Sequence, residues 1–106
     1  MVSENKSGAY DDVNEDNYIG KAITVGISQI EAKVGSNRLS GRQELLIFNH
    51  SKKTIYFGPT SVSVSGANRG IPIFSKEMAR VPAGEDIAVF LIASSASLEI
   101  TIQEMS

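Results

Sequence analysis

The stretch Leu98-Glu99-Ile100-Thr101-Ile102-Gln103 alternates apolar and polar residues without a fault. Successive side chains of a β-strand point to opposite faces of a sheet, so apolar residues at every second position share one face. The alternation therefore predicts a strand with one face in a core and the other in solvent, which is typical of antiparallel sheets.

Other apolar runs precede this strand in the sequence. The longest covers residues 86–93 and is expected to form a central strand. A shorter run at 44–48 lies between polar residues and predicts a strand that is covered on both faces. The polar turn at 49–53 leads into residues 54–57, and this arrangement predicts a hairpin.

The rest of the chain repeats the pattern in shorter pieces. Residues 23–34 change the parity of their alternation near Gly26, which predicts a bulge or a sharp bend. Residues 61–65 alternate cleanly and predict another strand, and Pro72 favours an edge position for the segment around it. Residues 76–80 are long enough for one helical turn at most.

Short strands at close spacing, separated by turn residues, predict an all-β domain that is a small β-sandwich or a jelly-roll-like barrel. A chain of 106 residues has the length of one domain. We expect residues 19–106 to form this domain and residues 1–18 to form an extended N-terminal arm outside it.

The arm differs from the domain in charge. Residues 1–18 carry five acids against one lysine, a balance of −4, whereas the remaining residues carry seven acids and nine bases, a balance of +2. A segment this polar buries too little apolar area to offset the entropy that is lost when it becomes ordered. We therefore expect the arm to act by docking on a partner. The residues expected to make this contact are Tyr10, Asp11, Asp12, Glu15, Asp16 and Tyr18.

Catalytic and metal chemistry find little support in the residues. There is no cysteine, which excludes disulfides, thiolate zinc sites and cysteine nucleophiles. The single histidine, His50, lies in a polar turn without the positioned partner that a general base needs. The acids of the arm are clustered and lack the glycine of a calcium-binding EF-hand loop. We therefore expect no enzyme activity, no metal and no cofactor.

Other partner classes can be weighed in the same way. A balance of +2 spread over the domain is not the basic stripe of a nucleic-acid binder, and no apolar segment reaches the roughly 18–20 residues of a membrane span. The N-terminus also lacks the apolar stretch of a leader peptide, so export by an attached leader is not expected. Tyr56 and Arg69 are expected on the surface. An exposed Tyr56 could stack on a sugar ring, so a glycan-binding module stays an alternative.

Several turn motifs occur in a distinctive order. An arginine precedes an apolar strand, and N-x-S, I-Y-x-G, G-I-P and P-A-G-E follow it. These motifs are Ser40-Gly41-Arg42, Asn49 with Ser51, Ile55-Tyr56-Phe57-Gly58, Gly70-Ile71-Pro72 and Pro82-Ala83-Gly84-Glu85. The order, over about residues 22–103, resembles that of small bacteriophage β-sandwich proteins found among virion structural components.

The resemblance implies a non-enzymatic structural protein of a virus particle, most directly a capsid decoration or head-fibre protein. It implies assembly in the host cytoplasm and residence in the virion. The expected partners are further copies of the chain, in a homo-oligomer for which a trimer is favoured, and the major capsid protein or another virion protein. A tail- or neck-associated virion protein and a small glycan-binding module are the alternatives.

Overall fold

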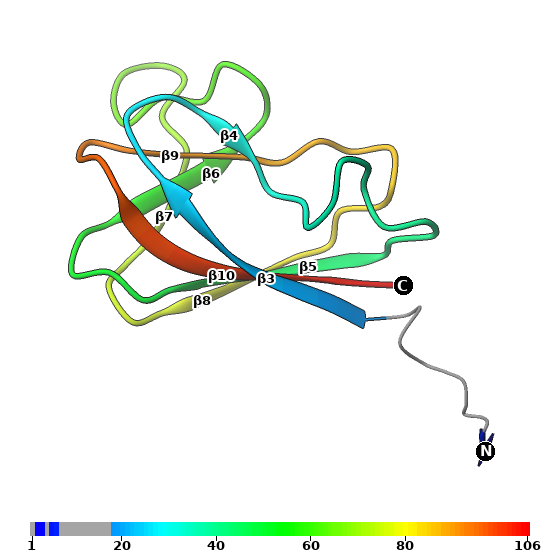
Figure 1. The fold of residues 1–106 in the computed structure, drawn as a ribbon. Helices are drawn as coiled ribbons and strands as arrows, with labels where there is room; N and C mark the ends of the chain where they lie inside the picture. The colour runs from blue at the N-terminus through cyan, green and yellow to red at the C-terminus, as the bar shows by residue number, and fades with distance from the viewer. Residues whose placement is uncertain (1, 4, 7–17) are drawn as a thin grey trace.

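A computed structural model describes residues 2–3, 5–6 and 18–106, in which every regular element is a β-strand (Figure 1). The strands are β1 (Val2–Ser3), β2 (Asn5–Lys6), β3 (Tyr18–Val25), β4 (Ile30–Glu31), β5 (Glu44–Asn49), β6 (Ile55–Gly58), β7 (Ile71–Ile73), β8 (Met78–Val81), β9 (Phe90–Ala93) and β10 (Leu98–Met105). The all-β prediction is confirmed.

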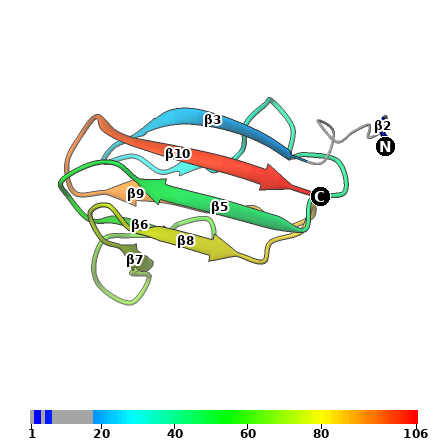
Figure 2. The same cartoon turned by 90° about the horizontal axis from the view of Figure 1, so that it is seen from below.

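Two four-stranded sheets pack against each other. The first has the order β3-β10-β5-β8 and the second the order β4-β9-β6-β7, and all neighbours within them are antiparallel. Figure 2 shows the first sheet in front of the second. The short β1 and β2 pair only with each other. The predicted β-sandwich is thus the observed architecture.

The core lies between the sheets and is built from alternate residues of each strand. β10 shows the principle, since Ile100 and Ile102 are fully buried whereas Glu99 is exposed. The alternation of more and less buried residues continues to Met105, although Glu104 puts a polar residue on the core face, and β10 is one of the two longest strands. The largest apolar side chains that are fully buried are Leu45, Ile47, Ile55, Leu91, Ile100, Ile102 and Val25.

The parity change near Gly26 marks a crossing between the sheets. β3 ends at Val25 in the first sheet, and β4 begins at Ile30 in the second. The chain bends at 27–28, and the Gly26 carbonyl accepts a hydrogen bond from the Ala93 amide. The predicted bend is confirmed, and the change of parity follows because the core lies on opposite sides of the two sheets.

One predicted hairpin and one predicted strand are wrong. The turn at 49–53 does not close a hairpin, because β5 belongs to the first sheet and β6 to the second. Residues 61–65 do not form a strand, although they alternate. The Ser63 hydroxyl donates to the Ser65 carbonyl and accepts from the Ser65 amide, so this segment forms a local turn instead of a ladder.

Two predicted elements also differ from the structure. Residues 76–80 hold no helical turn, since β8 begins at Met78 and pairs with β5. The strand predicted over 86–93 begins only at Phe90, although β9 is central in its sheet as expected. Its first half turns instead, with the Ile87 amide donating to the Gly84 carbonyl. The edge position predicted around Pro72 is confirmed by β7.

Gly70 opens the G-I-P motif at a point where two segments nearly touch. A Cβ atom there would lie 2.6 Å from the Phe57 carbonyl oxygen and 2.6 Å from Val62 Cγ2. We expect Gly70→Ala to lower the free energy of unfolding by about 2 kcal/mol, because the backbone of β6 must shift to admit the methyl group. Urea unfolding followed by circular dichroism measures this, with Gly35→Ala as a matched control. Equal stability of the two variants would contradict the expectation.

Candidate interaction surface

Among the described residues one ion pair is fully buried, between Arg42 at the entry to β5 and Glu104 near the end of β10. Both side chains are 0% exposed, and Arg42 Nη1 donates to Glu104 Oε2 over 2.7 Å. The carboxylate also accepts from the backbone amides of Val34 at 2.9 Å and Leu39 at 3.2 Å. A buried charge is costly unless it is paired and hydrogen-bonded, and these contacts meet that condition.

The guanidinium group uses all of its N–H donors in this centre. Besides Glu104 it donates to four backbone carbonyls, and an arginine has five N–H groups in total. The carbonyls belong to Ala32, Ala83, Gly84 and Ile87. Arg42 thus holds the β4–β5 and β8–β9 connections together at one end of the sandwich, which is a structural role.

Two of the sequence motifs meet at this centre. The Gly41 amide donates to Glu85 Oε1 over 2.8 Å, and Arg42 binds the carbonyls of Ala83 and Gly84. The arginine motif and the P-A-G-E motif are therefore two halves of one contact. Arg42 could be identified from the sequence as a motif residue, but Glu104 could not, because its only signal was an acid at a core-facing position of the 98–105 strand.

Asn49 is a second buried polar centre, at the opposite end of β5. Its side-chain nitrogen donates to the carbonyls of Lys53 at 2.7 Å and Ile73 at 2.9 Å. Its side-chain oxygen accepts from the amide and the hydroxyl of Ser51. These bonds shape the turn between β5 and β6 and join it to β7, so the N-x-S motif is structural as well.

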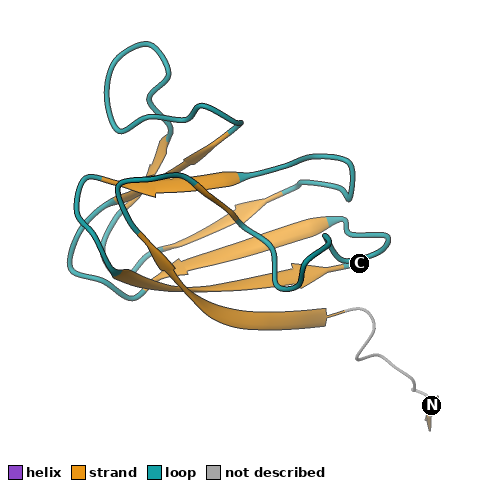
Figure 3. Ribbon diagram, turned by 45° about the horizontal axis from the view of Figure 1, so that its top comes forward, coloured by secondary structure: helices purple, strands orange, loops and turns teal. Residues whose placement is uncertain are grey.

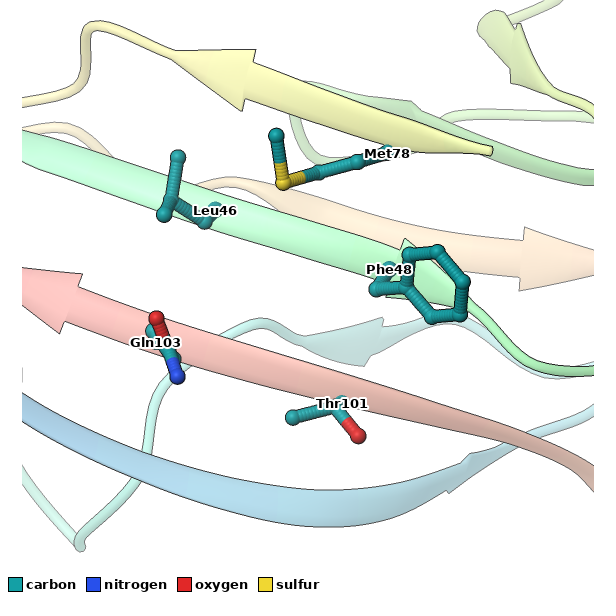
Figure 4. A pocket seen from close by; sticks show the side chains of 5 residues that line it. All are labelled: Leu46, Phe48, Met78, Thr101 and Gln103. Carbon is teal, nitrogen blue, oxygen red and sulfur yellow. The ribbon is translucent and has the colours of Figure 1, made fainter. Parts of the chain in front are cut away.

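The outer face of the first sheet carries a hollow. This hollow has a volume of about 130 Å³. It is lined by Leu46, Phe48, Met78, Thr101 and Gln103, and we refer to these five residues as the hollow (Figure 4). Met78 is 56% exposed, and Leu46 and Phe48 are half-buried. The prediction that residues 44–48 are covered on both faces is therefore wrong, because no second layer covers this side of β5 in the described structure.

Two basic turns lie beside the hollow, the β5–β6 turn with Lys52 and Lys53 and the β7–β8 turn with Lys76. Hydrogen bonds join them, from Lys76 Nζ to the His50 carbonyl and from the Ser75 hydroxyl to the Ser51 carbonyl. All three lysine side chains are exposed. We call these two turns, which carry Lys52, Lys53 and Lys76, the basic turns.

The residues predicted to contact partners are distributed over several places. Tyr10, Asp11, Asp12, Glu15 and Asp16 lie outside the described residues. Tyr18 begins β3 and pairs with Met105. Tyr56 is half-buried on the second sheet, opposite Pro72 and Ile92. Arg69 is exposed in a loop and bridges to Ser63. The structure does not bring Tyr56 together with Tyr18, because they belong to different sheets.

Residues 2–3, 5–6 and 18–106 contain no group of three or more histidine, cysteine, aspartate or glutamate side chains placed to hold a metal ion. The same residues contain no helix long and apolar enough to cross a membrane.

Comparison with known proteins gives information about the fold only. No family model and no curated protein matches the chain. Among solved structures it is similar to protein NMB1881 from Neisseria meningitidis, with 11% identity, a TM-score of 0.53, and 89% of this chain and 80% of that one covered. It is also similar to a protein of the Bacillus endospore appendages, a family of disulfide-linked pili, with 12% identity and a TM-score of 0.45. That similarity covers 84% of this chain and 85% of the other, and no argument is based on it. The first similarity shows that this β-sandwich arrangement occurs in another protein.

Proposed function

We propose that this chain is a non-enzymatic structural protein that acts by binding other subunits of a larger assembly. The observation that carries the proposal is the contrast between its interior and its surface. The buried polar side chains Arg42, Asn49 and Glu104 have hydrogen-bond partners within the fold. The outer face of the first sheet, in contrast, has a hollow lined mainly by Leu46, Phe48 and Met78 that no described layer covers, where burial of an apolar side chain of a partner would be favourable.

The assembly that we propose is a virus particle, with the chain as a bacteriophage capsid decoration or head-fibre protein. The order of the turn motifs and the layout of a compact sandwich behind an acidic arm support this proposal. In it, the sandwich projects from the shell, and Tyr10, Asp11, Asp12, Glu15, Asp16 and Tyr18 make the contact to neighbouring subunits. The chain would then be present as a homo-oligomer, with a trimer favoured, and reside in the virion.

Assembly of the full chain is the test of this function. We expect native mass spectrometry to give multiples of 11.4 kDa and sedimentation to show co-migration with phage shell proteins. A matched variant, D11N/D12N/E15Q/D16N, should lose both associations at an unchanged melting temperature, because it removes arm charge and leaves both sheets intact. A parent chain that stays monomeric and joins no shell protein would contradict the proposal, as would unchanged assembly of the variant.

A further inference from the structure

The cations of the domain divide into two groups. Four take part in ion pairs among the described residues, namely Lys33, Arg38, Arg42 and Arg80. Five form no ion pair within residues 18–106, and they are Lys21, Arg69 and the three lysines of the basic turns. Three of these five cations therefore lie in two adjoining turns at one end of the sandwich.

The basic turns and the hollow form one continuous surface, which His50 connects. The His50 ring packs edge-on against Phe48 with 4.6 Å between ring centroids, and His50 Nε2 lies 2.7 Å from Thr101 Oγ1. Phe48 and Thr101 both line the hollow. The His50 carbonyl in turn accepts from Lys76 Nζ. An extended segment could thus place acids on the lysines and an apolar side chain in the hollow.

The arm joins the sandwich at the opposite end of the same sheet. Tyr18 pairs with Met105 at one end of β10, whereas Asn49, next to the basic turns, pairs with Ile100. Figure 2 shows this separation, with the start of β3 at one end of the sheet and the β5–β6 connection at the other. β3 runs from Tyr18 at the first of these ends to Val25, which pairs with Leu98 at the end that holds the basic turns.

We propose that the acidic arm of one copy docks on the basic turns and hollow of a second copy, so that copies are joined head to tail. This inference rests on the proposed function and names the receptor for the arm. The arm has a balance of −4 and the domain one of +2, so the two surfaces are complementary in charge. Seventeen residues extend to at most about 56–61 Å, enough to cross onto a neighbouring sheet. Contacts of this heterologous kind close into rings or continue as filaments.

Two carboxylates oppose this docking. Glu99 is exposed and, by the alternation of β10, shares the outer face with Thr101. Glu77 is also exposed and directly follows Lys76 in the β7–β8 turn, so it reduces the net positive charge of that turn. Replacing Glu99 by glutamine should therefore strengthen the association of copies severalfold, because it removes the repulsion of the arm at the edge of the hollow.

Charge reversal on each side tests the proposal in the full chain. The receptor-reversed variant is K52E/K53E/K76E, the arm-reversed variant is D11K/D12K/E15K/D16K, and K21E/R69E is a control for the loss of other unpaired cations. Sedimentation velocity at about 0.15 M salt should show self-association weakened roughly tenfold or more in each reversed variant, and little changed in the control. An equimolar mixture of the two reversed variants should recover association, because each arm then meets a receptor of opposite charge on the other chain.

The mixture separates docking between copies from docking within one chain. If each arm folded onto its own domain, mixing could not restore the mismatched pairs, and that result would overturn the proposal. So would a receptor-reversed chain that associates as the parent does, or a parent that binds shell protein but not itself. In these last two cases the proposed function survives, provided the arm-reversed variant loses its associations. If the arm-reversed variant assembles normally, both fail.

Discussion

Arg42→Met should lower the free energy of unfolding by about 3–5 kcal/mol, because the substitution leaves the buried Glu104 carboxylate without its charged partner. It also removes the arginine donors from the carbonyls that Arg42 binds, three of which, those of Ala83, Gly84 and Ile87, lie in the β8–β9 loop. Among these, the Gly84 carbonyl keeps its bond from the Ile87 amide. Domains of this size have total stabilities of about 5–15 kcal/mol, so the variant should be marginally folded at 25 °C. Urea titration followed by circular dichroism gives the difference.

An exposed ion pair on the same sheet provides the control. Arg80 Nη1 donates to Glu44 Oε2 over 2.8 Å, but the Arg80 side chain is 60% exposed. Solvent screens such pairs, so Arg80→Met should change stability by less than about 1 kcal/mol. Similar losses for Arg42→Met and Arg80→Met would show that burial does not set the strength of the inner pair.

A double-mutant cycle separates the pair from the rest of the network. R42M/E104M removes both charges, so it should be less destabilised than the sum of the single variants by at least about 2 kcal/mol. It should still be less stable than the parent, since the loop carbonyls lose their donors in either background. Additive effects of R42M and E104M would contradict direct coupling between the two side chains.

Strand patterns that depend on a single core face could be predicted from the sequence. The alternation over 98–103 identified β10 and its buried face, and Pro72 identified an edge strand. The same pattern failed at 61–65, where serine side chains bind the local backbone and no neighbouring strand completes a ladder. Alternation reports which side chains share a face, but it does not report whether a partner strand exists.

The candidate surface was less predictable because its parts are distant in sequence. Arg42 and Glu104 are 62 positions apart, and their contact depends on the pairing of β10 with β5. The hollow combines β5, β8 and β10, so no local run of residues reveals it. Phe48 was assigned to a strand covered on both faces because an apolar run looks the same whether its outer side meets another layer or remains open.

Asn49→Ala should be the other severe substitution, with an expected loss of about 3 kcal/mol in the free energy of unfolding. Asn49 is fully buried, and its amide supplies donors to the Lys53 and Ile73 carbonyls. Alanine leaves both acceptors without these donors and opens space beside them, and neither effect is offset by a new contact.

The neighbouring Ser51 gives a graded control for this centre. Its hydroxyl oxygen lies 2.7 Å from Asn49 Oδ1 and 2.9 Å from the Lys53 carbonyl oxygen, and its one proton can be donated to either acceptor. Ser51 is only half-buried, so water can replace this hydroxyl. Ser51→Ala should therefore cost about 1 kcal/mol, clearly less than Asn49→Ala, in the same urea titration. Hydrogen exchange adds a local measure, because the Ser51 amide donates to Asn49 Oδ1 and should lose protection first in the alanine variant, whereas the Lys76 amide donates to the Asn49 main-chain carbonyl, which alanine retains. If Asn49→Ala is no more damaging than Ser51→Ala, the asparagine does not organise the basic end of the sandwich. If it is more damaging, the geometry of the basic turns depends on one buried amide. The charge reversals of Lys52 and Lys53, whose side chains make no hydrogen bond to the described residues, then act on docking, whereas that of Lys76 also removes its bond to the His50 carbonyl.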